Sequence, residues 1–175
     1  KKKTLSTSKD SAETLKQIQT ASESLKSSAD QLTNTGKDSV FSKGQDEIYK
    51  AVDSFVTNYN KLIEGSAKSA SDSITKRVDT LKNMTESNQK LLGQAGITIG
   101  KDDTLTLDKD AFAKADANTV KTLFSGSYSY ASRVSSQSSF IDFAATQEAA
   151  KANTYTTKGT YSNTYASGNI FNSYF

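Results

Sequence analysis

Apolar side chains recur every three or four positions through four long stretches of the chain, at about residues 11–32, 48–63, 72–92 and 130–151. This spacing places them on one face of an α-helix. Each apolar stripe is narrow, like the seam of a coiled coil, so each helix needs partner helices to cover it. The pattern predicts a mainly α fold, an elongated antiparallel helical bundle with coiled-coil-like seams.

The predicted seams contain mostly aliphatic and aromatic side chains. They comprise Leu15, Ile18, Ser22, Leu25, Ala29 and Leu32; Ile48, Val52, Phe55, Val56, Tyr59, Leu62 and Ile63; Ile74, Val78, Leu81, Met84, Leu91 and Leu92; and Tyr130, Val134, Gln137, Phe140, Ile141, Phe143, Ala144 and Glu148. Phe55 and Tyr59 lie on the richest apolar face, so we interpret them as core residues rather than as a ligand-stacking pair. Thr85 and Asn88 interrupt the third seam, where a polar side chain either fixes the register of the helices or faces solvent.

The hydrophobic period changes to two between residues 97 and 107. Ile97-Thr98-Ile99 and Leu105-Thr106-Leu107 each alternate apolar and polar side chains. The glycine and aspartates of residues 100–104 favour a tight loop between these two runs. We therefore predict one small β-hairpin at 97–107.

The carboxylates Asp102, Asp103, Asp108 and Asp110 form the densest acidic cluster. Their order does not match a calcium-binding EF-hand loop. We interpret them as turn-forming and helix-capping residues instead. Asp108 begins a predicted short helix at about 108–115, and a second short helix follows a break at 116–118 and ends at Phe124.

The chain contains no histidine, cysteine, proline or tryptophan. The absence of proline lets long helices run unbroken, whereas the absence of histidine removes the usual general base and the commonest metal ligand. The serines lie in no GxSxG motif, and the glycines form no phosphate-binding loop. We therefore predict no catalytic, cofactor-binding or metal-binding residues and do not expect an enzyme.

The composition of the chain disfavours nucleic acid and a membrane as partners. Only 34% of the 175 residues are hydrophobic, the mean hydropathy is -0.61, and the net charge is +3 with both signs interspersed. Such a mild charge does not favour nucleic acid, and the basic residues 1–3 receive no function because chain ends commonly fray. No apolar run reaches the roughly 18 residues of a membrane span, and no secretory signal pattern is visible.

The composition changes at residue 153. This change divides the chain into a helical stalk domain at 1–152 and a Ser/Thr/Tyr-rich C-terminal tail at 153–175, expected to be irregular. The aromatic side chains of this tail are candidate partner-binding residues: Tyr155, Tyr161, Tyr165, Phe171, Tyr174 and Phe175. Such a tail either packs back on the bundle or docks on a partner as an adhesive strand.

Two blocks of sequence carry a family resemblance. The first, Phe55-Val56-Thr57-Asn58-Tyr59-Asn60, has the form FVxxYN. The second leads from Leu91-Leu92 through Gly96-Ile97-Thr98 to the Leu-Thr-Leu-Asp run that ends at Asp108, and then to a VxxLF motif at 120–124. In this order the blocks resemble the C-terminal part of bacterial flagellar filament-capping proteins, also called hook-associated proteins.

The resemblance covers about residues 45–150. It implies an exported, extracellular structural protein whose helical stalk lies at the tip of a flagellar filament, contacts flagellin or other filament subunits, and self-associates. Asp103 stands where the family commonly has glycine, and we expect the turn to be kept because aspartate tolerates a left-handed backbone. The family's large head domain has no counterpart in these residues, so a short cap-like relative with a different surface role is one alternative. A secreted or surface-displayed helical scaffold or adhesin, derived from the cap stalk and binding through the aromatic tail, is the other.

Overall fold

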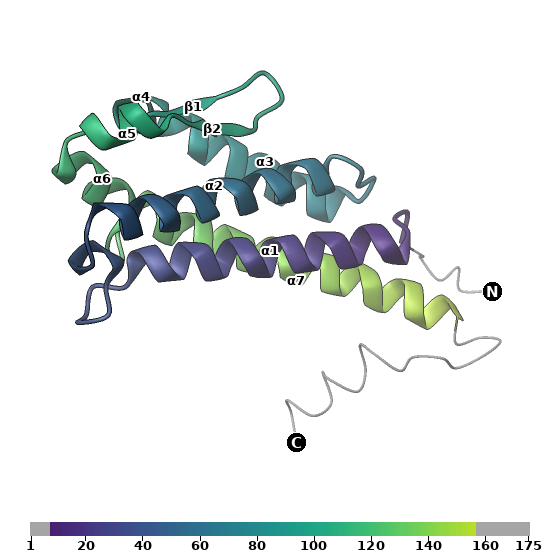
Figure 1. Ribbon diagram of the computed structural model, residues 1–175. Helices are drawn as coiled ribbons and strands as arrows, with labels where there is room; N and C mark the ends of the chain where they lie inside the picture. The colour runs from purple at the N-terminus through teal and green to yellow at the C-terminus, as the bar shows by residue number, and fades with distance from the viewer. Residues whose placement is uncertain (1–7, 157–175) are drawn as a thin grey trace.

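The computed structural model describes residues 8–156, with side chains as far as Lys151. This part of the chain is mainly helical with one small two-stranded antiparallel sheet, which confirms the prediction of a mainly α fold with a single β-hairpin (Figure 1). Its elements are α1 (Ala12–Thr33), the 3-10 turn η1 (Val40–Ser42), α2 (Gln45–Ser66), α3 (Asp72–Ser87), α4 (Gln89–Gln94), β1 (Ile97–Ile99), β2 (Leu105–Leu107), α5 (Lys109–Lys114), α6 (Ala117–Phe124) and α7 (Tyr130–Thr156). The long helices α1, α2, α3 and α7 lie side by side (Figure 1).

Helices α1 and α7 run antiparallel. The Gln19 amide donates to the Thr146 hydroxyl over 3.0 Å, and the Ser135 hydroxyl donates to Asp30 over 2.5 Å near the other end of the pair. Buried alanines and serines let the two helices pack closely. Ser22 and Ser138, each fully buried, donate to backbone carbonyls of their own helices. These hydroxyls are therefore satisfied without widening the interface.

An aromatic cluster joins α2, α6 and α7. The ring of Phe55 is fully buried and lies 5.5 Å from the ring of Phe124 and 5.9 Å from that of Tyr130, both edge-on. Edge-to-face packing at these centroid distances adds stability beyond the area that is buried. Phe55 and Tyr59 are thus core residues, as predicted.

Thr85, one of the two polar residues at seam positions, is buried between helices and does not face solvent. It is 1% exposed, and its hydroxyl accepts a hydrogen bond from Tyr59 over 3.0 Å and bonds to the Tyr130 hydroxyl over 2.8 Å. Burial raises the pKa of Tyr59 to about 12. Since this row of hydroxyls crosses from α2 through α3 to α7, it fixes how these helices are rotated against one another.

The prediction of one continuous third helix over 72–92 is wrong. Helix α3 ends at Ser87 and α4 begins at Gln89. Between them the Asn88 side chain donates to the Met84 carbonyl over 2.9 Å. An asparagine that bonds to a nearby carbonyl competes with the helical pattern, which explains the break.

The prediction that Phe140 and Phe143 support the last seam is also wrong. Phe140 is 46% exposed and Phe143 is 60% exposed. The buried face of α7 follows Val134, Ile141 and Ala145, and Phe143 lies two positions from Ile141, which points it away from that face. The guanidinium of Arg77 on α3 covers the Phe140 ring at 5.0 Å. The helix also continues past Lys151, to Thr156.

Candidate functional site

The predicted hairpin lies between α4 and α5, and its two strands pair as an antiparallel ladder. Ile97 faces Leu107 and Ile99 faces Leu105. The loop closes because the Gly100 amide donates to the Thr104 carbonyl over 2.8 Å. Asp103 has φ +67°, which makes it the one left-handed non-glycine residue in the part of the chain that the structure describes. The expectation that aspartate keeps the turn in place of glycine is confirmed.

The aspartates of the acidic cluster shape the turn and cap the helix. Asp102 accepts hydrogen bonds from the hydroxyl and amide of Thr104, at 2.6 Å and 3.1 Å, and these lower the pKa of its carboxyl. Asp108 caps α5 by accepting from the Ala111 amide over 3.0 Å, whereas Asp110 is exposed in the first turn of α5. Within residues 8–151, no three carboxylates converge closely enough to hold a metal ion.

Gly96 fixes the position of the hairpin against α5. Its φ is +81°, and a Cβ there would lie 2.8 Å from the Phe112 backbone nitrogen. The Gly96 carbonyl also accepts from the Asp108 amide over 2.8 Å. Only glycine allows the strand and helix to approach so closely.

Asn60 on α2 clamps the hairpin to the bundle. Its amide nitrogen donates to the Leu105 carbonyl over 2.8 Å, and its amide oxygen accepts from the Leu105 backbone nitrogen over 2.7 Å. The side chain thus takes the place of a neighbouring strand at the free edge of β2.

The other residues of the FVxxYN block face different elements. Asn58 donates to the Ser28 hydroxyl over 2.6 Å and to the Ser24 carbonyl over 3.3 Å, both on α1. Tyr59 bonds to Thr85 on α3, and Phe55 packs on α6 and α7. A short stretch of α2 therefore holds α1, α3, α6, α7 and the hairpin together. Sequence reasoning named this block but did not find these pairings.

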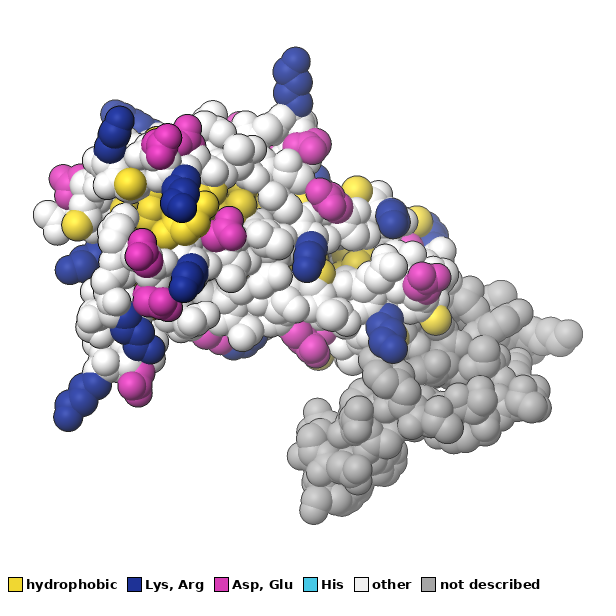
Figure 2. Space-filling model, viewed as in Figure 1, with side chains coloured by type: hydrophobic (Ala, Val, Ile, Leu, Met, Phe, Trp, Pro, Cys, Tyr) yellow, Lys and Arg dark blue, Asp and Glu magenta, His cyan; other side chains and the backbone are white. Residues whose placement is uncertain are grey.

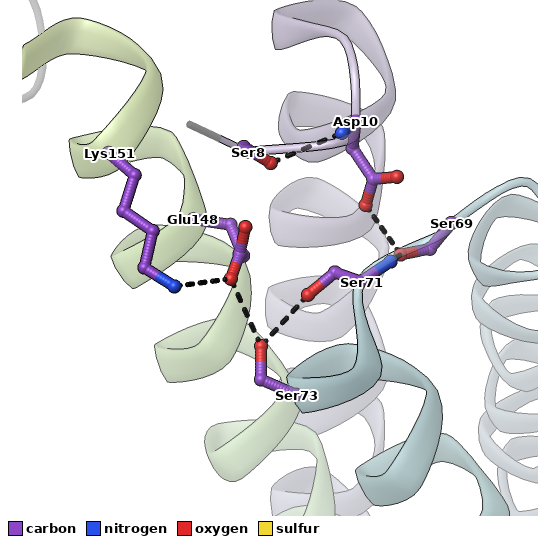
Figure 3. Close-up of polar contacts among 7 residues, drawn as sticks. All are labelled: Ser8, Asp10, Ser69, Ser71, Ser73, Glu148 and Lys151. Carbon is purple, nitrogen blue, oxygen red and sulfur yellow. Dashed lines mark hydrogen bonds and ion pairs between the residues drawn. The ribbon is translucent and has the colours of Figure 1, made fainter. Parts of the chain in front are cut away.

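A second polar cluster (Figure 3) lies at the end of the bundle away from α6, where the α2–α3 turn lies near the start of α1 (Figure 1). Asp10 accepts from the Ser69 hydroxyl over 2.5 Å and from the Ala70 amide over 2.7 Å. Glu148 on α7 accepts from Ser73 over 3.3 Å and from Lys151 over 3.0 Å. We call Asp10, Ser69, Ser71, Ser73 and Glu148 the serine cluster. The heptad pattern predicted a seam position for Glu148, but no pattern in the sequence predicted that Asp10 and the three serines would lie near it.

The serine cluster is built around the carboxylate of Glu148, which is 6% exposed. Burial raises the pKa of Glu148, but hydrogen bonds from Lys151, Ser8 and Ser71 outweigh burial and hold the pKa below its ordinary value. A carboxylate with a lowered pKa is a poor base for activating a serine. The cluster instead ties the segment before α1, the α2–α3 turn and α7 to one another (Figure 3).

An apolar groove opens between the start of α2 and the α5–α6 segment. Phe112 and Val120 are buried at its base, and Phe41, Ile48 and Tyr49 are half-buried in its walls. Two adjoining hollows of about 370 and 60 Å³ make up this groove. Figure 2 shows apolar surface ringed by basic and acidic side chains over this end of the molecule. We call it the α2–α5 groove.

The predicted partner-binding residues fall at the edge of the described chain or beyond it. Tyr155 lies within α7, but its side chain is not described. Tyr161, Tyr165, Phe171, Tyr174 and Phe175 lie outside the described residues. Whether the tail packs on the bundle or docks on a partner stays a prediction.

No family model, curated protein or solved structure matches this chain. Among the described helices, none combines the length and the apolar character needed to cross a membrane.

Proposed function

We propose that this chain is a structural, non-enzymatic, exported protein of the flagellar-cap type, which works through contacts with flagellin and with copies of itself. The observation that carries the proposal is the clamp of Asn60 on Leu105. These residues belong to the two sequence blocks that resemble the cap family, and they lie 45 positions apart in the chain. The clamp therefore joins, in the folded domain, the two blocks on which the resemblance rests.

The shape of the hairpin also supports a contact role. Its loop projects from the side of the helices (Figure 1), and Gly100, Lys101 and Asp102 at its tip are exposed. The hairpin is held at Gly96, just before β1, and at Leu105, the first residue of β2 after the loop. A protruding loop on a rigid base can present side chains to a partner with little loss of entropy on binding.

The alternative function is a secreted or surface-displayed helical scaffold or adhesin. Exposed aromatic side chains favour it: Phe143 on α7 is 60% exposed, and Tyr128 in the α6–α7 connection is 96% exposed. Aromatic residues are enriched in the contact surfaces of binding proteins. A cap protein and an adhesin would be found at different places on the cell, so the location of the protein separates the two functions.

The test is immunogold electron microscopy of producing cells and shed filaments. A cap protein is expected at filament tips. Gold spread over the cell surface would favour the scaffold or adhesin, and gold found only inside the cell contradicts both functions.

A matched pair of variants links this test to the clamp. In cells that carry only the variant chain, Asn60→Ala should reduce labelling of the tips because the hairpin loses its anchor. Asn83→Ala changes an exposed asparagine on α3 and should leave the labelling intact. Equal labelling with both variants would show that the clamp is not needed for the role at the tip.

A further inference from the structure

We propose that the α2–α5 groove of one copy of this chain receives the aromatic end of the tail, residues 170–175, of a second copy. The inference concerns self-association and does not depend on a role at a filament. It rests on the chemistry of the groove, the composition of this segment and the distance between the two sites.

The side chains that line the groove favour an apolar occupant that carries no positive charge. Aromatic and aliphatic side chains form most of its lining, which also includes Gln45 and the small side chains of Ala113 and Ala117. Three basic side chains line the groove, Lys50, Lys109 and Lys121, but only one acidic side chain does, Asp46. The ammonium of Lys109 lies 5.4 Å from the centre of the Tyr49 ring, a cation–π contact that a further aromatic ring can join.

Residues 170–175 have this composition. They read Ile-Phe-Asn-Ser-Tyr-Phe and contain no charged side chain. Phe171, Tyr174 and Phe175 together can bury roughly 450–750 Å² of their own surface. That area is below the share of one partner in a standard protein–protein interface, so each contact is expected to be weak and reversible.

The distance between groove and tail favours a second copy over the same chain. Helix α7 begins beside α6, where the rings of Phe124 and Tyr130 are 6.4 Å apart, and ends at Thr156 after 27 residues. At 1.5 Å per residue it carries the start of the tail about 40 Å from the groove end. Thirteen residues, as many as 157–169, can span at most about 45 Å, and only when they are fully extended. The chain's own groove is therefore at the limit of reach, whereas the groove of a neighbouring copy can lie closer.

The arrangement is head-to-tail. Groove and tail are different surfaces, so each copy can donate a tail and accept another at the same time. Such contacts produce a closed ring or an open row of subunits rather than only a symmetric dimer.

The test uses the full chain and three variants in sedimentation velocity over roughly 1–200 µM, because contacts of this size are weak. Phe171→Ser/Phe175→Ser removes the anchors of the tail. Ala113→Arg fills the groove from an exposed position on α5, and Thr122→Arg adds the same charge at an exposed position on α6 outside the groove. We expect association of the full chain to weaken at least about tenfold in the first two variants and to remain unchanged in the third.

Mixing the two defective variants gives the sharpest result. The Ala113→Arg chain keeps its tail and the serine double variant keeps its groove, so the mixture should form dimers that do not grow further. A full chain that stays monomeric over the whole range, or variants that associate as strongly as the full chain, would overturn the proposal. Circular dichroism checks the fold of each variant, and Ala117→Arg replaces Ala113→Arg if that chain unfolds.

Discussion

The two ends of the bundle are held together by different kinds of interaction. The serine cluster joins three segments with hydrogen bonds between hydroxyl groups and the carboxylates of Asp10 and Glu148. At the other end, the rings of Phe55, Phe124 and Tyr130 interlock. Stability at the first end therefore depends on the ionised state of Glu148, and stability at the second depends on shape and buried area. A change in pH and a change in side-chain volume should act on opposite ends.

Removing a ring from the aromatic cluster should have the largest effect. Phe55→Ala leaves a cavity where the side chain is 0% exposed, and such truncations lower the free energy of unfolding by about 3–5 kcal/mol. Urea unfolding followed by circular dichroism measures the change. Phe143→Ala, at a 60% exposed ring on α7, should change stability by less than about 0.5 kcal/mol. Equal losses for the two variants would contradict the assignment of the core.

Loss of the hairpin clamp should rank second. Asn60→Ala leaves the backbone N–H and C=O of Leu105 without their partners, at a cost of about 1–3 kcal/mol. Hydrogen exchange of the Leu105 amide should also become faster, while exchange in α1 stays slow. Asn83→Ala serves as the control. An unchanged exchange rate at Leu105 would mean that another group replaces the asparagine.

Acid should weaken the serine cluster by a smaller amount. The folded-state pKa of Glu148 is lowered, so the ionised carboxylate stabilises the fold above the ordinary pKa of glutamate, and this stability is lost as pH falls through the lowered value. Glu148→Gln should therefore flatten the pH dependence of the melting temperature below about pH 4.5, with a change of about 1 kcal/mol or less. Glu86→Gln, at an exposed position on α3, should leave the curve unaltered.

The smallest effect is expected between the ends, where α1 meets α7. Burial raises the pKa of Asp142, and the nearby Glu23 carboxylate raises it further. Ionised Asp142 therefore opposes folding above its raised pKa, and protonation relieves this opposition as pH falls. Asp142→Asn should raise stability at pH 7 by about 0.3–1 kcal/mol. The gain should disappear at pH 3, and a gain that is equal at both values would rule out the electrostatic cause.

Sequence periodicity predicted the elements of the fold but not all of their contacts. The hairpin at 97–107, the capping by Asp108 and the turn at Asp103 follow from short-range rules and were predicted correctly. The break at Asn88 was missed because a polar residue on a seam looks the same whether it bonds across helices or to its own backbone. Phe143 was misplaced because two apolar stripes of α7 overlap in sequence, and only the neighbouring helices decide which one is buried.

The clamp and the serine cluster lay beyond sequence reasoning for a different reason. Asn60 and Leu105 are 45 positions apart, and Asp10 and Ser69 are 59 apart. Polar residues without a period carry no signal of their distant partner. Only the packing of the intervening helices brings them within hydrogen-bonding distance.

The left-handed residue at the hairpin tip also affects how the loop responds to its surroundings. A glycine at position 103 would relieve strain of about 1–2 kcal/mol, but it would remove the carboxylate that lies 3.3 Å from the Lys82 ammonium on α3. The loop is thus tethered to the bundle by a partly exposed ion pair, which dissolved salt screens. Ionic strength therefore adjusts how firmly this protruding loop is held, whereas the aromatic cluster of α2, α6 and α7 contains no charge for salt to screen.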